Sequence, residues 1–141
     1  MKKIALGIFA LICFIKPWAQ NSSTTSFDVD GIKVIFKPTI KETVSVRVYF
    51  KGGVTNYPEN QAGIETLALS ALTECGTKKY TADAFKDTSD KYLIKIGGTS
   101  SYDYGFVSML SISKFFDKGW DLLTEAIMNP SFNESELNQL K

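Results

Sequence analysis

The 141-residue sequence contains no histidine. Most zinc sites in proteins use histidine or several cysteines, and most hydroxyl or thiol nucleophiles are activated by a histidine base. Because neither imidazole nor a cluster of thiols is available, the common hydrolase mechanisms lack their central group. The composition therefore predicts a protein that is not an enzyme of these kinds, with no metal and no cofactor.

Cysteine is nearly absent too, with Cys13 inside an apolar N-terminal run and Cys75 much further along. The bulky Ile12 before Cys13 argues against lipid attachment at that thiol. If the N-terminal run is removed on export, Cys75 is the only thiol left and no internal disulfide can form. Cys75 falls on the apolar stripe of a predicted helix, which favours a buried, unreactive thiol over a catalytic one.

The sequence also has no large surplus of either charge, since it contains sixteen basic and fifteen acidic residues and the two signs are interspersed. Proteins that bind nucleic acid or anionic surfaces usually carry a clustered positive surplus. The sequence therefore predicts no nucleic-acid partner.

The N-terminus has the layout of a secretory signal peptide, predicted over residues 1–20. A basic start is followed by an apolar run that Lys16 and Pro17 end well short of the roughly 20 apolar residues of a membrane span. Residues 21–26 are interpreted as a polar linker, and residues 27–141 as one domain. We expect an exported protein without a stable membrane span, either periplasmic or extracellular, with association with the outer membrane left open.

Alternating apolar residues predict an antiparallel sheet with one buried face. The pair Asp30-Gly31 separates two alternating segments, which is a strong signal for a β-hairpin. Phe106–Ile112 is predicted as a largely buried strand. The clearest alternation is in Thr43–Lys51, whose buried face is predicted to carry Val44, Val46, Val48 and Phe50.

Helical spacing of apolar residues predicts helices between and after these strands. Gly63–Cys75 forms an amphipathic pattern that ends at Gly76 as a C-terminal cap. A second helix is predicted to start at Thr81 as its N-cap. A third helix over Phe115–Met128 is predicted to bury an inner stripe of Phe116, Trp120, Leu123 and Ile127.

Together these segments predict an α+β domain in which helices cover one face of a mainly antiparallel sheet. Near the end, Asn133 and Glu136 form a helix-start signature, yet the sequence stops at Lys141 after about two turns. So short a helix indicates either a truncated chain or a terminal helix that folds only on docking to a partner.

The order of these segments resembles the opening of the insulinase-like M16 metallopeptidases, the family of pitrilysin and the mitochondrial processing peptidase. The resemblance covers about Phe27 to Lys141 and implies the LuxS/MPP-like metallohydrolase fold. Each matching segment is weak alone, but their order and spacing together are specific. These segments are Asp30-Gly31-Ile32-Lys33-Val34, Gly63-Ile64, Gly76-Thr77-Lys78-Lys79-Tyr80, Ser101-Tyr102-Asp103-Tyr104 and Asn129-Pro130-Ser131-Phe132.

In active members of that family, the helix that begins here at Gly63-Ile64 carries a His-x-x-Glu-His motif. Two imidazoles bind zinc, the glutamate activates the attacking water, and a glutamate from a later helix completes the site. The resemblance places Thr66 and Ser70 at the two histidines and Leu69 at the glutamate. Hydroxyls are poor zinc ligands near neutral pH, and Leu69 has no proton to exchange, so the resemblance implies a non-catalytic member.

Two acidic residues on the same predicted helix, Glu65 and Glu74, are nine positions apart. That spacing corresponds to about 13 Å along a helix, so the two carboxylates cannot share a metal. We interpret both as solvent-facing charges.

A second functional element of the family is an edge strand that pairs with the substrate backbone. Here Gly97–Tyr104 retains a Gly-Gly turn and a Ser-x-Asp portion of that pattern, but the segment is shorter and lacks an Asn-Ala pair. Ordinary pairing within the sheet is one interpretation. The other is capture of a peptide by strand addition, at Gly98, Thr99, Ser100, Ser101 and Tyr102.

By resemblance, M16 domains work as paired half-shells, and in bacterial pairs one subunit often keeps the zinc while its partner does not. We therefore expect the chain to be, or to begin, a zinc-free partner that helps to bind unstructured peptides for a catalytic M16 subunit. One alternative is a stand-alone exported module that binds a peptide or another protein without a protease. Another is a fragment without function.

Overall fold

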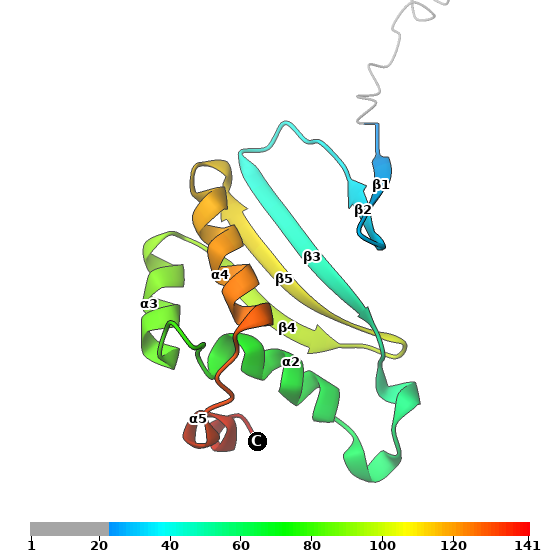
Figure 1. Ribbon diagram of the computed structural model, residues 1–141, viewed down its shortest axis with the longest axis vertical. Helices are drawn as coiled ribbons and strands as arrows, with labels where there is room; N and C mark the ends of the chain where they lie inside the picture. Colours follow the sequence, from blue (N-terminus) through cyan, green and yellow to red (C-terminus); the bar gives the residue numbers. More distant parts are fainter. Residues whose placement is uncertain (1–22) are drawn as a thin grey trace, which may run out of the picture. The chain divides into compact units, whose positions relative to one another are not determined.

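The computed structural model describes residues 23–141, so the predicted signal peptide lies outside the described residues. The chain divides into two compact units between Ile40 and Lys41, and its elements are labelled in Figure 1. None of the described helices is long and apolar enough to cross a membrane.

The first unit contains an antiparallel hairpin of β1 (Thr25–Val29) and β2 (Ile32–Phe36). Asp30 and Gly31 connect the strands with φ angles of 50° and 81°. A two-residue hairpin turn requires such positive φ angles, which asparagine, aspartate and glycine adopt most readily. The predicted hairpin is confirmed, but β1 begins at Thr25, inside the segment interpreted as a linker.

The second unit is built on a sheet of β3 (Thr43–Lys51), β4 (Lys95–Ser100) and β5 (Tyr104–Ile112). The strand order is β3–β5–β4, and both pairings are antiparallel, as predicted. Because successive side chains of a strand point to opposite faces, the register assigns every second residue of each strand to the same face.

Three ends of the helices in the second unit lie where capping residues predict them, at Gly76, Thr81 and Asn133. Gly76 follows the first helix with a φ of 75°, which is the left-handed conformation of a C-terminal cap. The Thr81 hydroxyl accepts the Ala84 amide proton at 3.2 Å, and the Asn133 carboxamide caps the last helix. These helices are α2 (Ile64–Glu74), α3 (Ala82–Lys91), α4 (Phe116–Met128) and α5 (Glu134–Leu140), with short 3-10 helices η1 (Val54–Asn56), η2 (Glu59–Gln61) and η3 (Ser113–Phe115).

Helices α2 and α4 pack on the same face of the sheet, which confirms the predicted α+β architecture (Figure 1). Buried apolar side chains from that face, from α3 and from α4 form one core. Its members are Phe85, Ile94, Val107, Met109, Leu122, Leu123 and Ala126.

Helix α4 buries most of the predicted stripe, because Leu123 is buried and Phe116 and Ile127 pack against the core, but Trp120 departs from it. Trp120 is 45% exposed, whereas Leu122 is fully buried. The cause is Gly119, where an added Cβ would lie only 3.0 Å from the Met109 sulfur. The missing side chain lets the helix approach β5 on its Gly119 side. Trp120, the next residue, therefore lies at the margin of the interface.

Candidate functional site

The residues that the resemblance placed at the metal-binding positions lie on α2, against strand β4. The hydroxyls of Thr66 and Ser100 share a hydrogen bond of 2.7 Å. One turn further, the Ser70 hydroxyl donates to the carbonyl oxygen of Gly98 at 3.1 Å. Both hydroxyls therefore join the helix to the strand.

The Gly97-Gly98 pair lies within β4, so the prediction of a turn at this pair is wrong. At Gly98 an added Cβ would lie 2.3 Å from the backbone oxygen of Leu69. Glycine is needed here because the helix backbone approaches the strand more closely than any side chain allows. This close approach brings the Ser70 hydroxyl within reach of the strand.

Leu69 is half-buried and extends from α2 towards the covered face of the sheet. An added Cβ at Gly105 would lie 2.5 Å from a methyl group of Leu69. Leu69 thus occupies the space over Gly105 as a packing residue.

Glu65 is not the solvent-facing charge that the sequence suggested. Its carboxylate accepts the backbone N–H of Gly53 at 2.6 Å and lies directly beside Gly52 and Gly105. The bond is charge-assisted and holds the start of α2 to the loop after β3. Glu74, in contrast, is exposed, as interpreted.

Strand β4 is an edge strand among the described residues, because it pairs only with β5. The Ser101 amide donates to the Tyr104 carbonyl at 2.7 Å, and in an antiparallel ladder such bonded pairs alternate along the strand. The backbone groups of Ile96, Gly98 and Ser100 therefore point away from β5. The Gly98 oxygen that accepts from Ser70 retains a second lone pair.

The remaining two residues of the predicted peptide edge lie beyond the end of β4. The carbonyl of Ser101 accepts the Val54 amide proton at 3.1 Å. The carbonyl of Tyr102 accepts two hydrogen bonds from Thr55, one from its backbone amide and one from its hydroxyl. The backbone available for strand addition is therefore the β4 portion of the predicted segment.

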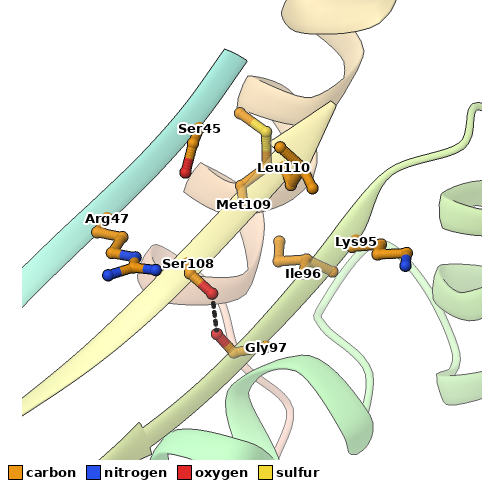
Figure 2. Close-up of a pocket in the computed structure, with 8 residues that line it drawn as sticks. All are labelled: Ser45, Arg47, Lys95, Ile96, Gly97, Ser108, Met109 and Leu110. Carbon is orange, nitrogen blue, oxygen red and sulfur yellow. Dashed lines mark hydrogen bonds between the residues drawn. The ribbon is translucent and has the colours of Figure 1, made fainter. Parts of the chain in front are cut away.

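A shallow hollow of about 390 Å³ lies on the open face of the sheet, the face opposite α2 and α4 (Figure 2). Arg47 and Lys95 are its two charged lining residues, and no acidic residue in the described part of the chain lines it. Arg47 alternates with the apolar residues of β3 and so belongs to its polar face, but only the register of the three strands brings it near Lys95. The sequence therefore did not predict the hollow. It is lined principally by Ser45, Arg47, Lys95, Gly97, Ser108 and Leu110.

Cys75 is buried, as predicted, and burial raises the pKa of its thiol above the ordinary value. A raised thiol pKa lowers the fraction of reactive thiolate at neutral pH. Across residues 23–141, no three histidine, cysteine, aspartate or glutamate side chains gather in a group able to hold a metal ion.

Residues 33–141 match the family model described as Insulinase (Peptidase family M16). A search of curated proteins gives no match. Among solved structures, the chain is similar to a protease from Helicobacter pylori, with 19% identity and a TM-score of 0.72, covering 84% of this chain and 29% of that one.

Two further solved structures share the fold. A peptidase M16 inactive domain from Pseudomonas fluorescens has 20% identity and a TM-score of 0.74, with 84% of this chain and 29% of that chain covered. The periplasmic protease PqqL from Escherichia coli has 18% identity and a TM-score of 0.71, with 89% and 15% covered. The chain thus spans less than a third of the length of each of these proteins.

Proposed function

The chain belongs to the insulinase (M16) peptidase family, and on that premise we propose that it is an exported, zinc-free member that helps to bind unstructured peptides for a zinc-bearing M16 subunit. The similarity to an M16 inactive domain supports the non-catalytic part of this proposal. The similarity to a periplasmic protease supports export.

The observation that carries the proposal is the bonding of Thr66 and Ser70. At the positions that the resemblance matches with the family's zinc-binding histidines, the chain has two hydroxyls, and both bond to β4. Neutral hydroxyls are weak ligands for zinc, and the residue that the resemblance matches with the general base is the apolar Leu69. This donor set does not fit zinc, so we assign the helix a structural role.

Peptide binding is assigned to the outer edge of β4. Ile96, Gly98 and Ser100 direct backbone donors and acceptors away from β5, and an extended peptide can pair with them as an added strand. Each such bond contributes about 1 kcal/mol net, so a few bonds give weak, sequence-tolerant binding. Weak binding of this kind suits a subunit that holds substrates and then releases them.

Co-purification from the native source tests the partner role. The full-length protein is captured with an antibody, and the material that comes with it is analysed by mass spectrometry and for zinc. A zinc-bearing M16 subunit in stoichiometric amount is the expected result. Recovery of this chain alone, unpaired and metal-free, contradicts the partner role.

A second candidate function is a stand-alone peptide-binding module. It is favoured by one observation, that residues of this chain supply both the edge of β4 and the lining of the adjacent hollow. Peptide binding by the purified monomer, together with co-purification of no protease, is the result that selects this function.

A further inference from the structure

The hollow on the open face lies directly beside the strand edge assigned to peptide binding. Its β4 lining residues are Lys95, Ile96 and Gly97, which belong to the strand that an added peptide would pair with. A peptide on that edge would direct every second side chain over the open face. The chemistry of the hollow therefore bears on which peptide side chains are accepted.

The register places Arg47, Ser108 and Gly97 in one row across the three strands. Lys95 lies two residues before Gly97 on the same face of β4. A peptide residue opposite Gly97 would therefore have Lys95 as its diagonal neighbour, about 7–8 Å away between Cα atoms. The added strand would lie about 14 Å from β3, because strands are spaced about 4.8 Å apart.

The Arg47 side chain is held in position on the open face. Its guanidinium lies 5.5 Å from the centre of the Phe106 ring and donates a long hydrogen bond of 3.5 Å to the Tyr49 hydroxyl. Stacking of a planar guanidinium on an aromatic ring reduces the entropy lost when the group binds a carboxylate. Figure 2 shows the side chain extending from β3 towards Ser108 on β5, and so towards β4.

Gly97 leaves the space between β4 and Ser108 open. An added Cβ at Gly97 would meet no atom within 4 Å, in contrast to the crowded Gly98. The Ser108 hydroxyl donates across this space to the Gly97 carbonyl at 3.4 Å. A long side chain from an added strand can therefore lie over Gly97 and enter the hollow.

We propose that a peptide added to β4 is selected for an acidic side chain, glutamate above all, at the position opposite Gly97, where its carboxylate binds between Arg47 and Lys95. The inference rests on the proposed strand addition and specifies its substrate class. Two basic groups attract a carboxylate, since none of the described residues that line the hollow is acidic, and they repel a lysine or arginine at the same position. Glutamate fits better than aspartate because it is long enough to lie over Gly97.

The test is a binding titration of the full-length protein with C-terminally amidated, fluorescently labelled peptides. A single glutamate is moved along an extended host sequence, and each peptide is compared with its glutamine counterpart. We expect one position at which glutamate tightens Kd roughly three- to tenfold, from two opposite-charge contacts. The preference is expected to shrink as salt is added.

Variants assign the preference to the hollow. The double variant Arg47→Gln with Lys95→Gln is expected to remove it, whereas the charge-matched control Lys78→Gln with Lys86→Gln is expected to keep it. Gly97→Val fills the space between β4 and Ser108. It is expected to weaken the binding of the glutamate peptide more than that of the glutamine peptide. The Cβ of that variant has free space, so the fold should tolerate it.

The outcomes separate this inference from the proposed function. Equal binding of glutamate and glutamine peptides at every position overturns the acidic selectivity and leaves strand addition intact. A preference that survives Arg47→Gln with Lys95→Gln also overturns it, because the carboxylate then binds elsewhere. Absence of binding by every peptide overturns strand addition and this inference with it.

Discussion

The two faces of the β3–β5–β4 sheet are built from alternate residues of the same strands, yet they differ in kind. On β5, Val107 and Met109 are fully buried beneath the helices. On the opposite face, Leu110 is 42% exposed and Arg47 and Lys95 flank a hollow. The covered face therefore carries the stability of the unit, and the open face is the one to which we assign recognition as a proposal.

Neighbouring residues of β5 give the sharpest test of this difference. Met109→Ala removes buried atoms against α4 and is expected to lower the free energy of unfolding by about 2–5 kcal/mol. Leu110→Ala, one position further on the open face, is expected to cost less than about 1 kcal/mol. Denaturant unfolding of both variants measures the contrast, and equal losses would show that the open face is also part of the core.

The adjacent glycines of β4 allow the covered and open faces to be compared by the addition of a single methyl group to each. Gly98→Ala forces a Cβ against the Leu69 backbone and is expected to cost about 1–3 kcal/mol. Gly97→Ala faces open space and is expected to change stability by no more than about 0.5 kcal/mol. Thermal unfolding of the two variants checks this prediction, and a tolerated Gly98→Ala would contradict the close approach of α2.

Removal of the hydroxyls that join α2 to β4 is expected to lower the free energy of unfolding by a smaller amount. Thr66→Val and Ser70→Ala each remove one hydrogen bond to the strand and are expected to cost about 1 kcal/mol. Thr99→Val, on the open face of β4, is the matched control and is expected to be nearly neutral. Urea titrations of the three variants provide the measurement. No loss in either α2 variant would remove the structural role assigned to those positions.

The smallest expected effect is the pH dependence due to Cys75. Its pKa is raised above the ordinary 9.0, first by burial and then by Glu136 and Glu74. Because the folded-state pKa exceeds the unfolded one, the contribution to stability is complete below pH 9 and is lost as pH rises through the raised value. Between pH 8 and 10, Tm should therefore fall more steeply for the wild type than for Cys75→Ala. Parallel profiles would contradict this.

Much of the fold followed from local patterns. The Asp30-Gly31 turn and the caps at Gly76 and Thr81 each depend on a few adjacent residues, and the structure confirms them. At such positions, local steric and hydrogen-bonding rules are enough to predict the backbone conformation from the sequence. The alternation in Thr43–Lys51 is confirmed as far as Val48, but Phe50, which was predicted on the buried face, is 37% exposed.

The features that escaped prediction depend on contacts between distant segments. Gly98 lies within a strand because Leu69 approaches it, although glycine pairs usually indicate a turn. Trp120 lies at the surface because the helix packs against Met109 through Gly119. At the candidate site, the sequence predicted a peptide edge at the β4 segment, which stays a prediction. Neither the bonds of Thr66 and Ser70 nor the hollow beside Arg47 could be inferred without the register of the strands.

The central claim is that α2 joins the sheet and does not hold a catalytic metal. The most direct test incubates the purified full-length protein with zinc and a fluorogenic unstructured peptide, in the presence and absence of a chelator. We predict that the peptide binds but that its cleavage does not exceed the protein-free control under either condition. Cleavage that the chelator abolishes would contradict the account.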